Sequence, residues 1–363
     1  MDFPTHIDEI SKRFSSINPR LYATTRNFGD GAVTKLSPYI SRGVISTRQV
    51  YDYILSLETP WHEAEKLIQE LAWRDYWQHV WIAKGEAIHT DLKSLQSPVS
   101  NYEIPKAILN ACTGIEVVDE AIKELYNTGY MHNHMRMYIA SVCCNIAHCH
   151  WLEPAKWLYA HLLDGDSASN QLSWQWVAGT FSNKKYYANQ DNINKFFRSE
   201  QKDTFLDVHY ESFDKLDIPD ILSETAPLEI DYLLPKVNDN SALKDQNSLI
   251  YNYYNIDPWW HKGEKFQRIL LLEPSKFERN RVSSKCITFA LELSKNIPDI
   301  KLFVGEFEEL FEYIQTDKIR YKEHPLNSNY SGFEEPRDWL SSVDGYFPSF
   351  FSFWKKCKKE LLQ

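Results

Sequence analysis

Three stretches of the sequence place hydroxyl, carboxylate, amide and aromatic side chains at spacings that could carry chemistry. They run over residues 22–43, residues 70–77 and residues 113–176. In the first stretch, Thr34 and Ser37 stand just before an expected helix. Hydroxyls in that position either cap the free N–H groups of the helix or help to bind a phosphate. If these two residues stood alone, capping would be the better explanation.

The charged residues of the other two stretches also have ordinary explanations when each is taken singly. Glu70 lies in an aromatic-rich segment beside Trp73, where a carboxylate is usually solvated or salt-bridged. Arg136 and Asp164 could form a simple ion pair, and the run from Asp164 to Asp166 could be only a turn. Only their joint occurrence in one order argues for a shared site.

These residues are carried by segments whose apolar spacing is helical. Apolar residues three and four positions apart predict helices, and Asn127-Thr128-Gly129 is a typical helix end. The expected helices cover residues 45–57, 61–82, 115–126 and 131–150, with a further one beginning at Pro154 and ending near Leu163. We therefore expect a mainly α protein in which residues 1–212 form an all-helical domain.

The rest of the chain changes character. Four prolines and weak periodicity in residues 213–263 predict a linker. Residues 264–363 are predicted to form a small α/β domain. Its expected strands are 268–272 and 301–305, and its expected helices are 276–294 and 308–314. Because no glycine-rich loop follows either strand, we expect this domain to be a structural layer without a nucleotide site.

Composition narrows the class of protein. The chain has 363 residues with 12 Trp, 21 Tyr and 19 Phe, which excludes a disordered chain. The net charge of −10 argues against non-specific binding of nucleic acid by bulk charge. We find no transmembrane run and no signal peptide, and six cysteines do not make a disulfide framework in a chain of this length. A cytoplasmic protein without a membrane partner is expected.

In their order and spacing, the three stretches resemble the flavin-binding helical domain of the photolyase/cryptochrome family over about residues 10–197. The resemblance implies a bent FAD molecule inside a helical bundle. It implies that the FAD diphosphate is embraced by Tyr22, Thr34, Leu36 and Ser37. It implies that the isoalloxazine is contacted by Arg136, Asp164, Asp166 and Asn170, the last facing flavin N5. An amide at N5 can accept a hydrogen bond from N5–H and so favours reduced flavin.

The same resemblance implies a lesion pocket and an electron path. The residues matched to the pocket that binds a flipped pyrimidine dimer are Glu70, Trp73, Asn133 and Trp176. Trp174 matches the tryptophan next to the flavin, and Trp151 matches the middle member of the family's tryptophan chain. Both carboxylate and amide types suit a dimer, which carries carbonyl and N–H groups.

Three features depart from the family pattern. His134 replaces an arginine at the DNA face, and Ile108 stands where we place the third tryptophan, five residues before Thr113. The family's antenna-type α/β domain normally precedes the flavin domain, whereas here an α/β segment follows it. Residues 347–356 resemble the phrase that usually closes the antenna domain. With so few strands, we expect no antenna chromophore pocket.

Two further clusters of side chains each have two possible interpretations. Five thiol and imidazole side chains could ligate a metal, but their place in an apolar helix favours a core role, so no metal is expected. They are Cys143, Cys144, His148, Cys149 and His150. Four basic residues after the Trp174–Trp176 motif are either a solvated face or phosphate contacts. They are Lys184, Lys185, Lys195 and Arg198.

Three hypotheses of function follow. The leading one is a light-driven, FAD-dependent lyase of the deoxyribodipyrimidine photolyase type, acting on UV-damaged DNA. The second is a cryptochrome-like blue-light photoreceptor or redox flavoprotein that signals to a partner without repairing DNA. The third, a relative that keeps the fold but not FAD, is disfavoured by the intact set of flavin-facing residues.

Overall fold

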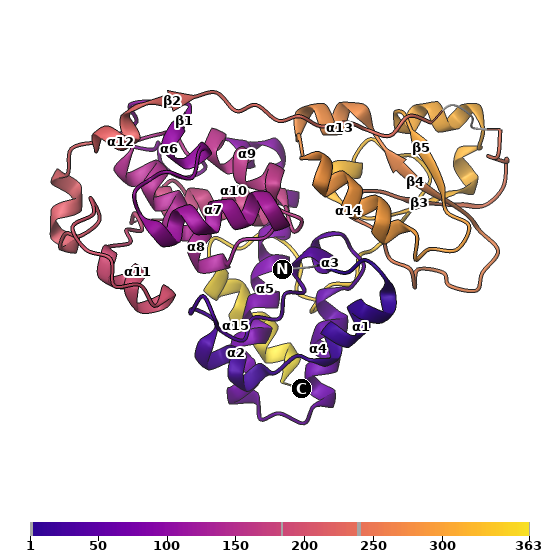
Figure 1. The fold of residues 1–363 in the computed structure, drawn as a ribbon. Helices are drawn as coiled ribbons and strands as arrows, with labels where there is room; N and C mark the ends of the chain where they lie inside the picture. The colour runs from indigo at the N-terminus through magenta and orange to yellow at the C-terminus, as the bar shows by residue number, and fades with distance from the viewer. Residues whose placement is uncertain (1–2, 183, 238–240, 363) are drawn as a thin grey trace. The chain divides into compact units, whose positions relative to one another are not determined.

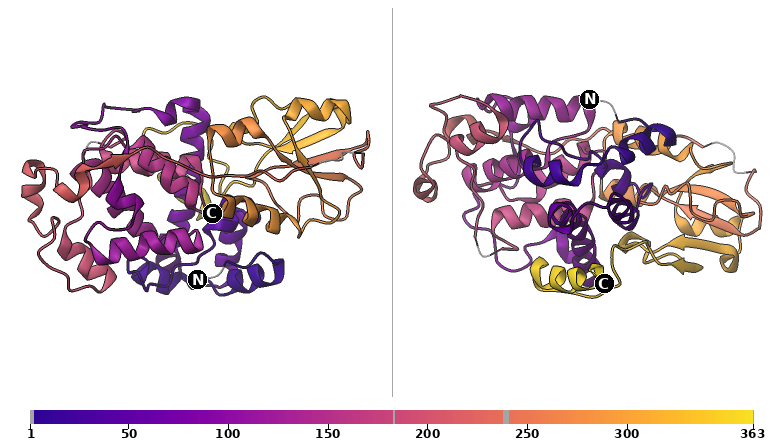
Figure 2. Two further views of the ribbon diagram at one scale, coloured as in Figure 1. Left: turned by 45° about the horizontal axis from the view of Figure 1, so that its top comes forward. Right: turned by 90° about the horizontal axis from the view of Figure 1, so that it is seen from below.

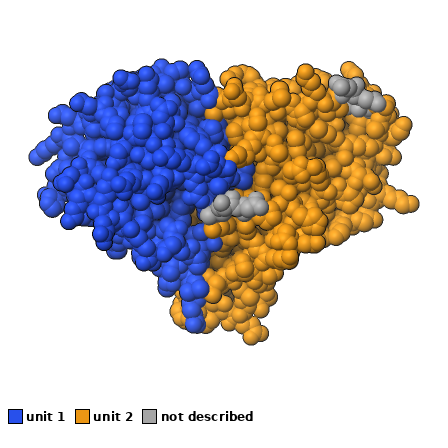
Figure 3. Space-filling model, in the orientation of Figure 1, with its two compact units in different colours: residues 1, 20–33, 83–229 blue, residues 2–19, 34–82, 230–363 orange. Residues whose placement is uncertain are grey.

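The computed structural model describes residues 3–182, 184–237 and 241–362. The backbone separates into two compact units, coloured in Figure 3. The first unit comprises residues 20–33 and 83–229. The second takes its described residues from the ranges 2–19, 34–82 and 230–363. Across the described residues, none of the helices combines the length and the apolar character needed to cross a bilayer.

The first unit is built almost entirely of helices (Figure 1). Its longer helices are α7 (Glu116–Thr128), α8 (Asn133–Ser141), α9 (Leu152–His161), α10 (Ser167–Ala178) and α11 (Gln190–Phe197). Shorter elements are α2 (Pro19–Thr25), η1 (Gly85–His89), α6 (Lys106–Leu109), η3 (Tyr210–Lys215) and α12 (Asp220–Ser223). One small antiparallel pair joins β1 (Ile104–Pro105) to β2 (Thr225–Ala226).

Local sequence signals set several of these boundaries. Helix α7 ends at Gly129, whose φ of 74° is a left-handed conformation that suits glycine, and this confirms the predicted end. Helix α10 begins where the Asp166 side chain accepts a hydrogen bond from the Ser169 N–H, and it ends at Gly179 with φ of 82°. The segment that presents the 164–176 motif is therefore held at both ends.

The predicted helix over residues 131–150 is too long. Helix α8 ends at Ser141 and passes into a π-helical turn, η2 (Val142–Ile146). In this turn the buried Asn145 amide donates to the carbonyl oxygens of Val177 and Tyr186, at 3.0 and 2.8 Å. His148 then takes a positive φ of 52°. The apolar periodicity that predicts a helix continues through this stretch, whereas the hydrogen bonds that accompany the break join Asn145 to residues far away in the sequence.

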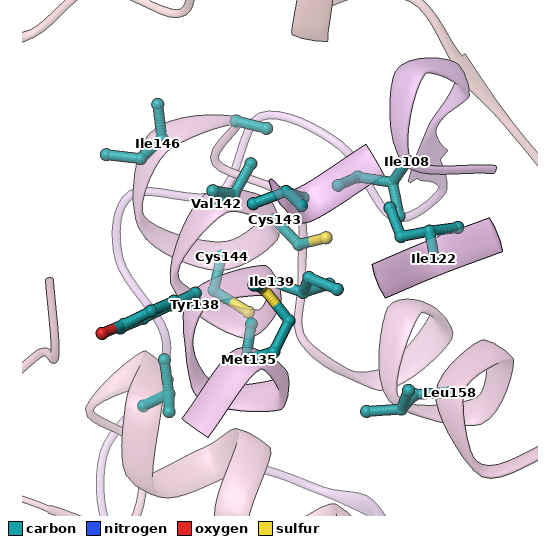
Figure 4. Packing of buried hydrophobic residues seen from close by; sticks show 14 of the residues in the cluster. Ile108, Ile122, Met135, Tyr138, Ile139, Val142, Cys143, Cys144, Ile146 and Leu158 are labelled. Carbon is teal, nitrogen blue, oxygen red and sulfur yellow. The ribbon is translucent and has the colours of Figure 1, made fainter. Parts of the chain in front are cut away.

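The cysteines of this stretch lie in the core of the first unit (Figure 4). Cys143 and Cys144 pack with Met135 and Ile139 and are almost wholly buried. Burial raises the pKa of both thiols well above the ordinary value, and it raises the pKa of Cys149 to about 12. These thiols are therefore protonated at neutral pH and act as small apolar side chains. In the described part of the chain, no group of three or more His, Cys, Asp or Glu side chains is arranged to hold a metal ion.

The second unit contains a five-stranded, fully parallel sheet with the order β5-β4-β3-β6-β7. The strands are β3 (Ser248–Tyr251), β4 (Gln267–Leu272), β5 (Lys301–Val304), β6 (Ile319–Lys322) and β7 (Phe333–Glu335). The first strand of this sheet along the chain, β3, lies at the centre and later strands are added on both sides, which is a doubly wound topology. The sequence predicts the α/β class and strands at β4 and β5, and both are confirmed.

Other details of this prediction are wrong. Residues 248–251, which we expected within a linker, form the central strand β3. The predicted helix over 276–294 is two helices, α13 (Pro274–Arg279) and α14 (Ser284–Ser294), and the predicted helix over 308–314 is the 3₁₀ segment η4 (Phe307–Glu312). A strand of four residues is too short to show a period, so only its pairing with two neighbours identifies it. Helix α14 runs beside the sheet in both Figure 1 and Figure 2.

The remaining elements of the second unit are helical. They are α1 (Ile7–Ser15), α3 (Ser37–Ser41), α4 (Thr47–Ser56), α5 (Trp61–Lys84), η5 (Thr316–Lys318), η6 (Pro325–Asn327) and α15 (Phe350–Leu361). One buried carboxylate ties α4 and α5 to the chain segment between β7 and α15. Asp75 on α5 accepts hydrogen bonds from the Thr47 hydroxyl at 3.0 Å and the Leu340 N–H at 2.7 Å. Burial raises the pKa of Asp75 to about 6, and these two hydrogen bonds oppose the rise in part.

This raised pKa predicts a pH dependence of stability. The folded protein holds the Asp75 proton more tightly than the unfolded chain, so the contribution of this carboxyl to stability falls as pH rises from about 4 to about 6. We expect Asp75→Asn to gain stability relative to the wild type by about 1 kcal/mol between pH 5 and pH 7.5. Urea unfolding at the two pH values measures the difference. Asp52→Asn, at an exposed position on α4, is the control, and an equal pH dependence of wild type and Asp75→Asn would contradict the assignment.

Candidate functional site

The start of helix α10 gathers the polar groups that the sequence predicts for the flavin ring. Asp166 is the N-cap residue, and its Oδ1 accepts from the Ser169 N–H at 2.7 Å. The hydroxyl oxygens of Ser167 and Ser169 are buried, and within the described residues they have no hydrogen-bond partner. A buried hydroxyl without a partner is costly unless a bound molecule supplies one. This first turn therefore suits a polar ligand.

Arg136 and Asp164 form the expected ion pair. The Arg136 Nη2 group donates to both carboxylate oxygens of Asp164, at 3.1 and 3.0 Å, and Nε donates to the Met131 carbonyl at 2.9 Å. The Asp164 side chain is only 2% exposed, whereas that of Arg136 is 20% exposed. These bonds fix the orientation of the Arg136 guanidinium, and the Asp164 carboxylate balances its charge.

The hydrogen bonds of Asn170 orient its amide. Nδ2 donates to the Ala155 carbonyl oxygen at 2.8 Å and to the Gln171 side-chain oxygen at 2.6 Å. Because both donor hydrogens are directed to protein acceptors, the opposite end of the amide is a carbonyl oxygen. This orientation is the one that the role predicted at flavin N5–H requires.

The three tryptophans of the first unit that the sequence analysis singles out occupy different environments. Trp174 and Trp151 are 2% and 0% exposed and belong to one apolar cluster, which also contains the fully buried Ile108. Trp176 is 38% exposed and lies 5.9 Å from the ring of Tyr186. Trp176 alone among them presents a ring to the outside, as a residue that stacks on a base must.

The predicted DNA-facing residues of α8 lie at its beginning. Asn133 is exposed on the first turn, and the side chain of His132 caps the helix. His134 bonds through Nδ1 to the Asn27 carbonyl at 2.9 Å, and burial lowers its pKa below the ordinary value. His134 is therefore neutral at pH 7 and is tied to the protein, so it does not replace the charge of an arginine.

The predicted diphosphate residues lie on both units. Tyr22 is half-buried on α2 in the first unit. In the second, the Thr34 hydroxyl accepts from the Leu36 N–H at 3.3 Å, and Leu36 is buried immediately before α3. The N-cap residue of α3 is the apolar Leu36 and Ser37 is the first residue of the helix, so the bond of Thr34 to the Leu36 N–H is the interaction that fits the capping role considered for these hydroxyls.

Glu70 and Trp73 lie three residues apart on α5 and so on one face of that helix. Both are half-buried. The ring of Phe350, from α15, stacks on Trp73 at 3.7 Å with an angle of 10°. The sequence predicts Trp73 as a wall for a flipped base, and the structure gives one of its two faces to Phe350.

The four basic residues after Trp176 do not act alike. Arg198 pairs with Asp30 at 2.8 Å, and Lys195 lies over the Phe196 ring at 5.2 Å. Burial lowers the pKa of Lys185 below the ordinary value. Arg198 is thus partly neutralised, and whether the cluster contacts phosphate stays a prediction.

The switch point of the parallel sheet, between β3 and β6, is filled by side chains of the same unit. Open α/β sheets bind ligands beyond the carboxyl ends of such strands. Here His324, which follows β6, stacks on Tyr254 at 4.5 Å, and the Arg42 guanidinium lies 3.7 Å from the Tyr253 ring centroid. The sheet has more strands than we expected, but these residues take the place where a ligand would bind.

Sequence reasoning missed several polar groups of the first unit. The Ser167 and Ser169 hydroxyls lie inside the quoted 164–170 motif, so their position was the only available signal. Gln171, which orients Asn170, and Asp91, which accepts from the Trp151 indole N–H at 2.7 Å, gave no signal in the sequence. Their roles depend on contacts between distant segments.

Comparison with known proteins finds relatives of the helical part of this chain. Residues 67–212 match the family model described as the FAD binding domain of DNA photolyase. A deoxyribodipyrimidine photo-lyase of Streptomyces griseus is 33% identical over 150 residues, which cover 41% of this chain and 32% of the relative. A cryptochrome DASH of Gloeobacter violaceus is 31% identical over 166 residues, covering 44% and 33%. The chain thus spans about a third of the length of these relatives.

A solved structure shows the same relationship. The crystal structure of a Synechocystis cryptochrome matches 54% of this chain and 44% of its own, with a TM-score of 0.50 and 26% sequence identity. The family match covers α7 to α11, which include the ion pair, the Asn170 amide and the two buried tryptophans. Through this helical segment, the chain is similar to proteins of the photolyase/cryptochrome family.

Proposed function

We propose that the protein binds FAD and uses light to split pyrimidine dimers in UV-damaged DNA, as a lyase of the photolyase type. The observation that carries the flavin part is the polar set at the start of α10. It combines two buried hydroxyls that have no partner among the described residues, an oriented amide and a buried ion pair. A rigid, polar-edged aromatic ring system matches these donors and acceptors.

The chain's own residues would hold the cofactor in defined ways. Arg136 would lie against the isoalloxazine with its charge balanced by Asp164, and the Asn170 carbonyl oxygen would accept from N5–H. Tyr22, Thr34, Leu36 and Ser37 are proposed for the diphosphate. Bound FAD supplies light absorption and one-electron chemistry.

The proposed substrate residues would bind a flipped dimer. Glu70 and Asn133 can hydrogen-bond its polar edge, and Trp73 and Trp176 offer aromatic faces. Trp176 is exposed, whereas Trp73 is half-buried, with Phe350 stacked on it and the Trp77 ring 5.0 Å away. In this role the residues would orient the dimer, and no proton transfer by the protein would be required.

A cryptochrome-like photoreceptor or redox flavoprotein is the second candidate. Two observations favour it. His134 is neutral and bonded to the protein at the position where the family resemblance implies an arginine, and Phe350 stacks on Trp73. In that case light would change the flavin state without repair, and a signalling partner would read the change.

The repair activity is tested directly. Protein reduced with dithionite and mixed with UV-irradiated oligothymidine should split the dimers only under blue light, which is followed as recovery of the ultraviolet absorbance of thymine. Glu70→Ala should slow this repair by about ten- to a hundred-fold through loss of one hydrogen bond. FAD content, measured by absorbance after denaturation, should not change. Glu124→Gln on the exposed face of α7 is the matched control.

The two candidates predict different results in this assay. A yellow protein that leaves dimers intact after prolonged illumination supports the photoreceptor over the lyase. A colourless protein that does not take up added FAD contradicts both. Loss of FAD from Glu70→Ala would show that Glu70 belongs to the cofactor site instead.

The orientation of Asn170 predicts the effect of a charge at N5. Asn170→Asp should disfavour anionic reduced flavin by about 1–4 kcal/mol, the repulsion expected for two like charges in a protein interior. Absorbance spectra recorded during blue illumination with a thiol donor should show less fully reduced flavin than in the wild type. Asn110→Asp, which adds the same charge at an exposed position of the first unit, should behave as wild type. Equal reduction in both variants would place Asn170 away from N5.

A further inference from the structure

We propose that Tyr102 is the surface electron donor that refills Trp151, through the ring of His150, when the flavin is photoreduced. The inference rests on the proposed FAD function and names the exit of its electron path. The family-like third position, Ile108, cannot serve, because an aliphatic side chain is not oxidised and because this position is 0% exposed. A donor that exchanges electrons with solvent must lie at the surface.

Three rings in the first unit form a continuous path from the core to solvent. The Trp151 ring is fully buried, and its centroid lies 5.7 Å from that of His150. The His150 ring stacks on Tyr102 at 5.4 Å with an angle of 25°. Tyr102 is 68% exposed. Two ring-to-ring steps of under 6 Å therefore connect the inner tryptophan to an exposed phenol.

The backbone holds this path in place. Residues 100–101 and 148–150 run side by side, with a parallel bridge between Asn101 and Cys149. The Ser100 N–H donates to the His148 carbonyl and the His150 N–H donates to the Asn101 carbonyl, both at 2.8 Å. An exposed tyrosine would otherwise lose side-chain entropy to remain on one partner. Here the hydrogen bonds between the two backbone segments hold Tyr102 and His150 close to each other.

Asp91 supplies the electrostatics of the path. Its Oδ1 accepts from the Trp151 indole N–H at 2.7 Å and lies 3.3 Å from His150 Nε2. The Asp91 side chain is only 10% exposed, so its charge acts through a medium of low dielectric constant. A carboxylate there stabilises positive charge on the indole and can accept its N–H proton. Trp151 is therefore placed to be oxidised and then reduced again.

The electrons and protons balance as follows. Bound FAD would supply the light-excited oxidant, and Trp174 would give up one electron. Trp151 gives an electron to Trp174, and Tyr102 gives one to Trp151. The exposed phenol then loses its O–H proton to water, which leaves a neutral tyrosyl radical. A soluble thiol restores Tyr102 by donating a hydrogen atom, while His150 only conducts and is neither oxidised nor reduced.

The experiment compares radicals in the FAD-loaded protein. Wild type with oxidised flavin is illuminated with blue light, frozen and examined by electron paramagnetic resonance, and a parallel sample contains a nitroso spin trap whose adducts are mapped by mass spectrometry. We expect a tyrosyl signal and an adduct at residue 102. Tyr102→Phe and His150→Leu should lose both, and Tyr102→Trp should give a tryptophanyl signal instead. Tyr210→Phe, at a 51% exposed tyrosine outside the path, should match the wild type.

The outcomes separate this inference from the function on which it rests. A protein without bound flavin overturns the proposed function and this inference with it. A yellow protein in which Tyr102→Phe keeps the wild-type tyrosyl signal, or in which the adduct maps to another tyrosine, overturns the role of Tyr102 alone. A yellow wild type that forms no tyrosyl radical does the same, because Trp151 would then be refilled by another route.

Discussion

The buried contact between Arg136 and Asp164 constrains the functional half of the first unit. A carboxylate that is 2% exposed cannot remain charged in an apolar interior unless a cation stays beside it. Removal of one partner of such a pair costs about 3–5 kcal/mol, so α8 and the segment before α10 are held together. The segment held by this contact leads into the first turn of α10, which carries Asp166, Ser167 and Asn170. The same turn then presents hydroxyl and carbonyl oxygens in a region otherwise built from apolar side chains.

The aromatic residues of the proposed electron path are buried in the core at one end and exposed to solvent at the other. Trp151 and Trp174 lie in a cluster that excludes water, where a positive charge is costly without a counter-charge. Asp91 provides that counter-charge at Trp151. Tyr102 lies at the opposite end of the ring path, where water can take up a proton. Redox chemistry inside a helical bundle needs both conditions in one chain.

The second unit shows that topology and local function are separate matters. Its sheet has the doubly wound order that offers a ligand site at the switch point, yet Arg42, Tyr254 and His324 fill that place. Burial lowers the pKa of His324 well below the ordinary value, so a neutral imidazole can stack there without a counter-charge. Phe350 on α15 covers one face of Trp73 in a similar way. Aromatic packing thus occupies surfaces that relatives of this fold could use for ligands.

The sequence by itself determined the helical class of the first unit, the C-terminal end of α7 and the α/β character of the C-terminal part of the second unit, and the family resemblance indicated the pairing of Arg136 with Asp164. The first three features follow from local spacing and from a capping glycine. Tertiary structure alone decided the central position of β3, the break after α8, the stacking of Phe350 on Trp73 and the path from Trp151 to Tyr102. Each of these depends on segments far apart in the chain, and a strand of four residues or a single exposed tyrosine carries no periodic signal. The sequence predicts the residues of the flavin site, whereas only three-dimensional contacts orient the Asn170 amide and connect the buried tryptophan to the surface.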